Sequence, residues 1–271
     1  MSESMLRQIT AVVISYYSDE MVLELTAQLP PDMPLIVVDN AAESALGQAL
    51  TKARPGSRYI HLPQNAGFGG AANAGVAQVE TDFVVILNPD IDFVDRTLTD
   101  AVAMMQADPQ LSALGELRPL RFWRFVLTHY ITGAFLVLRR QAFEAIEGFD
   151  ETFFLFYEDT DLSVRLMYAG FHIAGLPTLP RHRDGRSVSA ARDSQSERRW
   201  LLGASARLFG RKHGVFTKAG LTMRWMMWKT ARKASDDARA AMILRGYREA
   251  AGQEAESLRD NLFTTGRRRA D

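Results

Sequence analysis

The sequence lacks cysteine, and this absence excludes disulfide bridges and thiolate metal sites. It also lacks any apolar run near the roughly 18 residues that a membrane-spanning helix requires. Residues 1–15 do not show the basic segment followed by a long apolar segment that marks a signal peptide. These absences favour a cytoplasmic protein in a reducing compartment.

The formal net charge is zero, but the charges are unevenly distributed. Residues 1–210 hold 18 Lys+Arg and 25 Asp+Glu, a net charge of −7, whereas residues 211–271 hold 14 and 7, a net charge of +7. A basic tail on an acidic body indicates contact with an anionic surface, either a membrane or a nucleic acid. We therefore expect a main domain at residues 1–210 and a basic, amphipathic helical extension at residues 211–271.

Apolar runs of strand length alternate with segments of helical spacing along most of the chain. The expected strands are residues 9–15, 35–38, 58–62, 83–87, 111–117, 131–140 and 171–176, with helices at 19–29, 41–53, 95–106 and 158–169. This alternation predicts an α/β fold, a mostly parallel, Rossmann-like sheet with helices on both faces. Residues 118–129 are rich in Arg, Phe and Trp without a clear period, and we expect a loop or flap there.

The central stretch of the chain runs from Phe83 to Asp92. Its first five residues are all apolar and indicate a strand buried on both faces. Pro89 ends this strand because proline lacks an amide proton, which leaves Asp90 at the sheet edge where ligands bind. Asp90 and Asp92 are hard oxygen ligands suited to Mg²⁺ or Mn²⁺. The alternative is an ordinary turn, since Asn, Pro and Asp are common turn residues.

A glycine-rich stretch at residues 65–75 holds four glycines and four alanines. Small side chains at the start of a helix let backbone amides approach a phosphate or sugar closely. Asn65 and Asn73 add amide donors and acceptors. The alternative is a small-residue helix packed tightly on the sheet. The stretch is not a P-loop, because it lacks Gly-x-x-x-x-Gly-Lys-Ser/Thr.

Three acids, Glu158, Asp159 and Asp161, follow an aromatic segment at the start of an expected helix. A carboxylate beside aromatic side chains can be partly desolvated and act as a base. Alternatively, these acids only favour the helix dipole. Arg165, one turn beyond Asp161, could pair with it. Asp39 ends the second strand, where it could hydrogen-bond a nucleotide or cap the following helix.

These motifs together resemble the inverting nucleotide-sugar glycosyltransferases of family 2, which have the GT-A fold, and among them the rhamnosyltransferase-like members. The matching motifs, in the family's order over about residues 9–190, are Val38-Asp39-Asn40, Asn65-Ala-Gly-Phe-Gly-Gly with Asn73 and Gly75, Leu87-Asn-Pro-Asp90, Gly148-Phe-Asp-Glu, Glu158-Asp159-x-Asp161 with Arg165, and His182 followed by Gly185 and Ser187. The chain departs from the family at Tyr17, where an asparagine is common, and at Asn88, which replaces the first acid of Asp-x-Asp.

The resemblance implies a site for each step of sugar transfer. It implies that Asp159 is the general base with Glu158 beside it, and that Asp90 and His182 hold a divalent metal, Mg²⁺ or Mn²⁺. The nucleotide-sugar-binding residues that it implies are Ser15, Tyr17, Asp39, Asn65, Gly67, Gly70, Asn73 and Asn88. Asp161 and Arg165 would contact the acceptor or support the site. The implied donor is a nucleotide-diphosphate sugar, with dTDP-rhamnose first, and the implied acceptor is a glycan or a lipid-linked glycan in cell-surface polysaccharide synthesis.

Residues 220–252 combine Trp and Met with spaced Arg and Lys. Such a segment can lie at the inner face of a membrane with its charges toward anionic headgroups. The same residues could instead pack on the main domain or form a homodimer contact. We do not expect nucleic-acid binding, because the segment matches no recognised nucleic-acid module.

The loop after the first strand argues against two other classes of α/β enzyme. A nucleotidyltransferase or a dinucleotide oxidoreductase should have a glycine-rich loop after the first strand, but Ser15-Tyr-Tyr-Ser-Asp-Glu follows it here. A catalytically silent nucleotide-sugar binder or membrane scaffold remains the alternative, because binding and turnover use many of the same residues.

Overall fold

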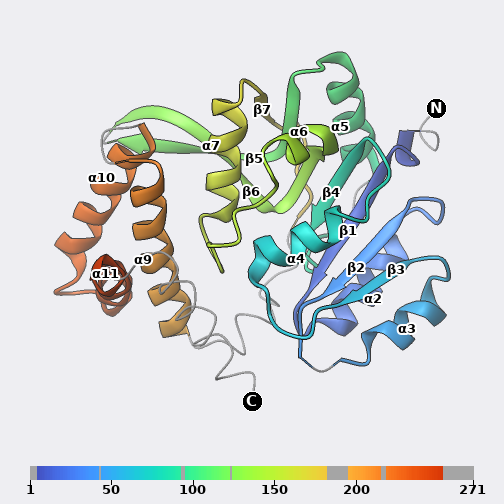
Figure 1. The fold of residues 1–271 in the computed structure, drawn as a ribbon, viewed down its shortest axis with the longest axis horizontal. Coiled ribbons are helices and arrows are strands. Elements are labelled where there is room, and N and C mark those ends of the chain that lie inside the picture. Colours follow the sequence, from blue (N-terminus) through green and yellow to red (C-terminus); the bar gives the residue numbers. More distant parts are fainter. Residues whose placement is uncertain are drawn as a thin grey trace.

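A computed structural model of the protein describes residues 5–42, 44–92, 95–122, 124–181, 195–214 and 218–252 (Figure 1). The strands are β1 (Ile9–Ser15), β2 (Leu35–Asp39), β3 (Arg58–His61), β4 (Phe83–Leu87), β5 (Leu111–Phe122), β6 (Phe125–Arg139) and β7 (His172–Gly175). The helices are α2 (Asp19–Gln28), α3 (Leu46–Ala53), α4 (Gly67–Val76), α5 (Asp95–Ala107), α6 (Arg140–Ala145), α7 (Glu158–Tyr168), α9 (Gln195–Lys212), α10 (Lys218–Lys233) and α11 (Ala238–Glu249), followed by the 3₁₀ turn η1 (Ala250–Gly252).

The strands form one sheet in the order β3-β2-β1-β4-β6-β5-β7. Neighbouring strands are parallel except at β6, which runs antiparallel to both β4 and β5. The expected α/β architecture with a mostly parallel sheet is confirmed. In register, Ser15 of β1 lies beside Asp39 of β2, so the carboxyl ends of the central strands meet at one edge.

Helices cover both faces of this sheet. Successive residues of a strand point to opposite faces, so Val13 belongs to an apolar cluster with Leu25 of α2, whereas Val12 belongs to another with Ala71 of α4. Every residue of β1, β2 and β4 is buried. Because full burial of a Val or Leu side chain contributes about 1.5–3 kcal/mol, these strands give the edge that follows them a rigid base.

Within residues 118–129, where we expected a loop or flap, residues 119–122 of β5 pair with residues 125–129 of β6 in a β-hairpin. Pro119 of β5 pairs with His129 of β6, and Leu120 pairs with Thr128. Leu120 is buried in a third apolar cluster with Met223 of α10. The loop prediction is wrong because the hairpin is supported by a helix far along the chain, and local periodicity does not report such support.

The C-terminal region is helical as far as the structure describes it. Helix α9 continues across the boundary that we expected after residue 210, and it packs against both α10 and α11. Met223 and Met227 of α10 are buried in the third cluster with Phe153 and Phe154. These two methionines therefore pack on the rest of the chain, as the alternative to membrane contact predicts for this segment. No helix in the described ranges is both long and apolar enough to cross a membrane.

Candidate active site

A cleft opens at the carboxyl edge of β1, β2 and β4. Its lining residues are Ile14, Tyr16, Ser18, Met21, Asn40, Asn65, Gly67, Phe68, Asn88, Pro89, Asp90, Phe154, Leu155 and Arg198. Its cavity volume is about 200 Å³. This is below the roughly 300–1,000 Å³ typical of small-molecule sites, so the enclosed part would take only part of a sugar nucleotide.

The loop after β4 supplies one wall of the cleft. The backbone N–H of Asn88 still pairs with the carbonyl of Ala134 on β6 at 3.0 Å, and the chain then turns at Pro89. Asp90 and Asn88 both line the cleft, as their position after a buried strand predicts. The N–H of Asp92 donates to the carbonyl of Arg181 at 2.8 Å, so the chain at Arg181 passes beside this loop.

The oxygens of Asp90 and Asn88 suit a hard divalent cation. In the described parts of the chain, no group of three or more His, Cys, Asp or Glu side chains could hold a metal. In nucleotide sites, Mg²⁺ is usually held by one or two carboxylates together with phosphate oxygens of the ligand. His182, the second expected ligand, lies outside the described residues.

The turn before α4 supplies the opposite wall. Asn40 donates from Nδ2 to Oδ1 of Asn65 at 2.8 Å and accepts at Oδ1 from the N–H of Ala66 at 2.7 Å. Gly67 has a φ of +75° and lies against the carbonyl of Phe154, so a larger residue there would be strained and would collide. Asn65 and Gly67 both line the cleft, so α4 begins at its wall.

The remainder of α4 is structural. A Cβ on Gly75 would lie 2.5 Å from Cγ1 of Val12, so this end of the helix packs directly on the sheet. Asn73 holds the loop before the acids: its Oδ1 accepts from the N–H of Phe149 at 2.9 Å and its Nδ2 donates to Glu151 at 3.0 Å. Gly70 is buried beside Ala66. Neither Asn73 nor Gly70 is among the lining residues of the cleft.

Three further expected residues lie just behind the cleft lining. Ser15 is buried, and its hydroxyl hydrogen-bonds that of Ser18 at 3.0 Å. Asp39 is fully buried and accepts from the Tyr59 hydroxyl at 2.8 Å and from a backbone N–H at 3.1 Å. Helix α3 begins seven residues later, at Leu46, so Asp39 does not cap it. Tyr17 has a φ of +51°, and its neighbour Tyr16 is the residue that lines the cleft.

The acid pair Glu158 and Asp159 begins α7. The two residues before it, Phe156 and Tyr157, have φ values of +70° and +68°. Two successive non-glycine residues in this left-handed region are costly and persist only where surrounding contacts hold them, which is common at functional sites. The backbone therefore enters α7 in a strained turn that positions both carboxyl groups.

The two carboxyl groups have different surroundings. Asp159 accepts hydrogen bonds from the N–H of Gly133 at 3.0 Å and from the N–H and hydroxyl of Thr160 at 2.6 and 3.1 Å. Glu158 is only 6% exposed, and its Oε2 has no hydrogen-bond partner among the described residues. Burial and the nearby Asp159 charge raise the pKa of Glu158 to about 8. Burial also raises the pKa of Asp159, although its donors oppose that effect. The three donors favour the ionised form of Asp159, whereas burial without a partner at Oε2 favours the protonated form of Glu158.

Asp159 meets the wall of the cleft at Gly133. A Cβ placed on Gly133 would lie 3.1 Å from the ring of Phe68, a lining residue, and 3.6 Å from Cβ of Asp159. Asp159 itself is not among the lining residues. The cleft and the acid pair are thus adjacent compartments that share the Phe68 and Gly133 wall.

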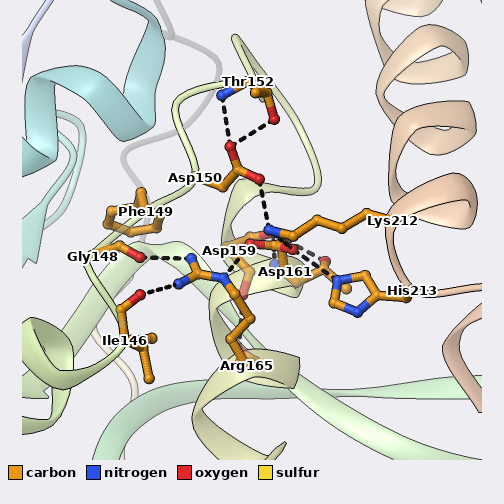
Figure 2. A network of polar contacts seen from close by, with 12 residues as sticks. Ile146, Gly148, Phe149, Asp150, Thr152, Asp159, Asp161, Arg165, Lys212 and His213 are labelled. Atoms are coloured by element: carbon orange, nitrogen blue, oxygen red, sulfur yellow. Dashed lines mark hydrogen bonds and ion pairs between the residues drawn. The ribbon is translucent and has the colours of Figure 1, made fainter. Parts of the chain in front are cut away.

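Asp161 and Arg165 belong to a buried ionic network (Figure 2). Oδ2 of Asp161 pairs with Nε of Arg165 at 2.6 Å, and Oδ1 pairs with Lys212 at 2.8 Å and with His213 at 2.7 Å. Lys212 also reaches Asp150 at 2.6 Å. The network joins α7 to the end of α9, so both residues support the site from behind.

Arg198 is a cleft residue that our sequence analysis did not select. It lines the cleft from α9, and its guanidinium lies 5.5 Å from the centroid of the Phe156 ring. No local pattern distinguishes it from other arginines of the helix, because only the packing of α9 on the body places it in the cleft that Asp90 also lines. A guanidinium in this position suits an anionic ligand such as a diphosphate.

Comparison with known proteins agrees with this geometry. Residues 12–120 match the family model "Glycosyl transferase family 2", and residues 122–186 match the model "N-terminal domain of galactosyltransferase". The N-acetylglucosaminyl-diphospho-decaprenol L-rhamnosyltransferase of Mycobacterium tuberculosis is 25% identical over 208 residues, 58% of this chain and 67% of the relative. The low-salt glycan biosynthesis hexosyltransferase of Haloferax volcanii is 21% identical over 194 residues, 60% of this chain and 62% of the relative.

Solved structures show the same fold. The mannosyltransferase PcManGT from Pyrobaculum calidifontis, in complex with GDP-Man and Mn²⁺, aligns with a TM-score of 0.63 at 19% identity and covers 96% of this chain and 79% of that one. S. aureus TarS in complex with UDP aligns with a TM-score of 0.52 at 16% identity over 94% of this chain and 92% of that one. The fold is GT-A, and the family-model match over residues 12–120 supports a glycosyltransferase of family 2.

Proposed function

We propose that this glycosyltransferase is inverting and metal-dependent, and that it moves a sugar from a nucleotide diphosphate to a hydroxyl of a glycan or lipid-linked acceptor. The observation that supports this most is the composition of the cleft, in which Asp90, Arg198 and the start of α4 at Gly67 face one space. A carboxylate that can hold a cation, a guanidinium and a helix N-terminus together suit a diphosphate.

On the donor side, a divalent cation bound at Asp90 would neutralise charge that develops on the departing diphosphate. Arg198 would hold the same oxygens from the opposite wall. Asn88, Asn65 and the Tyr16 ring would orient the rest of the nucleotide sugar. His182 remains a proposed second ligand of the cation.

On the acceptor side, Asp159 would remove the proton from the attacking hydroxyl. The oxygen–carbon bond to the acceptor forms while the bond from the anomeric carbon to the diphosphate breaks, and the nucleotide diphosphate leaves with that electron pair. A single displacement of this kind inverts the anomeric centre. The hydrogen bonds from Gly133 and Thr160 would favour the ionised form of Asp159 that this role requires.

We propose dTDP-rhamnose as the donor, on the strength of the mycobacterial rhamnosyltransferase relative. That relative's name also supports a lipid-linked N-acetylglucosaminyl diphosphate acceptor, and the name of the Haloferax volcanii relative supports a role in glycan biosynthesis. The structural neighbours with GDP-Man and Mn²⁺ or with UDP support a nucleotide-diphosphate donor and a divalent cation.

The proposal is tested by calorimetric binding of thymidine, uridine and guanosine diphosphates, with and without Mn²⁺. We expect thymidine diphosphate to bind best, to need Mn²⁺, and to lose binding in Asp90→Ala. The matched control is Asp82→Ala, an exposed acid at the other end of β4. Failure of the folded chain to bind any of the three would overturn the proposed donor site.

A transfer assay with dTDP-rhamnose then separates an enzyme from a silent binder. Asp159→Asn should retain nucleotide binding and lose roughly 100- to 10,000-fold in transfer rate, the usual effect of removing a general base. Near-full transfer by this variant would contradict the assignment of Asp159. Wild-type protein that binds the nucleotide and transfers nothing would be a silent binder.

A further inference from the structure

The surface formed by the β5–β6 hairpin tip and the outer side of α10 exposes apolar side chains among basic ones. In the described chain, the exposed large apolar residues include Phe125 and Val126 at the start of β6, and Met226 and Trp228 on α10. Phe125 is 57% exposed and Trp228 is 55% exposed. Helix α10 contacts both strands of the hairpin, which reaches across to it in Figure 1. We call this surface the tip–α10 patch.

The two sides of α10 have opposite character. Met223 and Met227 are buried in the cluster that contains Leu120 of the hairpin. Arg224, Trp228 and Arg232, spaced four residues apart, therefore share one side of the helix, and all three are exposed. Within the described chain, no other element covers Trp228 on that side, so its ring remains in contact with solvent.

Charge on the patch has a single sign. Helix α10 holds five Lys and Arg residues and no acid, and Arg121 and Arg124 flank the hairpin tip. Two of the cations lie over aromatic rings: Lys229 Nζ is 4.6 Å from the centroid of Trp225, and the Arg232 guanidinium is 4.9 Å from that of Trp228. Each aromatic ring of the helix is thus paired with a positive charge.

We propose that the tip–α10 patch docks the protein on a membrane that contains anionic lipids. Tryptophan and phenylalanine partition into the interfacial region, while Lys and Arg beside them attract anionic headgroups. A second copy of the chain fits less well, because a two-fold contact would place the same basic surface against itself. A nucleic acid would be attracted by the charges but leaves the exposed Phe125 and Val126 without a role.

Docking would also set the position of the cleft. Helix α9, which places Arg198 in the cleft, packs against α10 and α11. A patch held at the bilayer therefore holds the cleft at a fixed height above it. This consequence for a lipid-linked acceptor rests on the proposed function, whereas the docking itself does not.

The test is co-sedimentation of the full chain with vesicles of phosphatidylcholine alone and of phosphatidylcholine mixed with phosphatidylglycerol. We expect binding to the anionic vesicles only, with weaker binding as salt increases. Arg232→Glu should weaken partitioning at least about tenfold, because each basic residue near the surface adds roughly a fivefold factor and the change both removes one and adds a repelled charge. Trp228→Ser combined with Phe125→Ser should also abolish most binding.

The matched controls are Lys52→Glu, an exposed charge on α3, and Tyr168→Ser, an aromatic side chain that is 67% exposed on α7. Both controls should bind like the wild type, and circular dichroism should show that all variants are folded. The proposal is overturned if the wild type binds neither vesicle, if it binds both equally, or if the patch variants bind as the controls do. Two other outcomes would assign the patch to a different partner. In the first, the patch variants keep vesicle binding but lose a dimer that sedimentation velocity detects in the wild type. In the second, they keep vesicle binding but lose binding to duplex DNA. None of these results depends on sugar transfer, so docking and the proposed function fail separately.

Discussion

The Nε2 atom of His213 lies 2.7 Å from Oδ1 of Asp161, and both side chains are buried. Asp161 lies two residues after Asp159 on α7, and His213 follows the last residue of α9, the helix that carries Arg198. One contact therefore connects the helix of the proposed base to the helix of the cleft arginine. Lys212 and Arg165 complete the ionic network around the same carboxylate.

Asp161→Asn should strongly destabilise the fold. The change leaves Arg165 and Lys212 beside a neutral amide, and breaking a buried pair from one side typically costs about 3–5 kcal/mol. We expect the lower end of that range, because Lys212 is partly exposed. Urea unfolding gives the free energy of unfolding. Asp108→Asn, which removes an exposed pair with His172, is the control and should change little. Equal losses in the two variants would contradict the importance of the network.

The ionic network around Asp161 should also make the free energy of unfolding decrease at acidic pH. Burial raises the pKa of Asp161, but the hydrogen bond from His213 and the charges of Arg165 and Lys212 outweigh it, so the pKa lies below the ordinary 3.8. A lowered pKa means that this stabilisation is present above the unfolded-state pKa and is lost as pH falls through the folded value. Unfolding measured from pH 6 downward should show this loss in the wild type and less of it in Asp161→Asn.

Glu158 should make the stability of the fold decrease as pH rises, the opposite direction to the effect of Asp161, and Glu158→Gln should remove this decrease. The folded chain keeps a proton on Glu158 up to a pKa of about 8, whereas the unfolded chain releases it near 4.5. The folded state therefore binds more protons between these values, and stability should fall as pH rises across that window. The glutamine variant, which cannot ionise, should lose less stability from pH 5 to pH 8 in denaturant titrations. Parallel curves for variant and wild type would refute the buried, protonated state of Glu158.

Gly67→Ala should impair both folding and nucleotide binding. Alanine at a φ of +75° is strained by about 1–2 kcal/mol, and its Cβ would also collide with the carbonyl of Phe154. Gly56→Ala is the matched control, since Gly56 has a φ of +91° with nothing within 4 Å of the added atom. Thermal unfolding should therefore show the larger loss for Gly67→Ala, and only that variant should weaken nucleotide diphosphate binding.

Arg198→Ala should weaken nucleotide diphosphate binding without unfolding the protein. Hydrogen bonds to a charged group contribute about 1.5–3 kcal/mol, which corresponds to roughly a 10- to 150-fold loss of affinity. Arg199→Ala is the control, because Arg199 pairs with Gln195 on the same helix and does not line the cleft. Calorimetry of both variants with a nucleotide diphosphate that carries no sugar tests this prediction. Similar affinities in the two variants would exclude Arg198 from the site.

The sequence by itself determined the central sheet and the edge at which the cleft lies. The runs that form β1, β2 and β4 are apolar throughout, and a run buried on both faces can be recognised without knowing its neighbours. The place of Asp90 followed from this, because a proline that ends a core strand leaves the next residue at the sheet edge.

Only the tertiary structure decided the rest of the site. It placed Asn40 in the cleft and Asp39 behind it, supported the β5–β6 hairpin with α10, and brought Arg198 into the cleft that Asp90 lines. It also gave Asp161 its partners Lys212 and His213. Each of these outcomes depends on contacts between segments far apart in the chain, whose free energy comes from packing and charge pairing rather than local preference. The spacing of residues along the chain carries no information about such contacts, so only the tertiary structure shows that α9 completes the cleft.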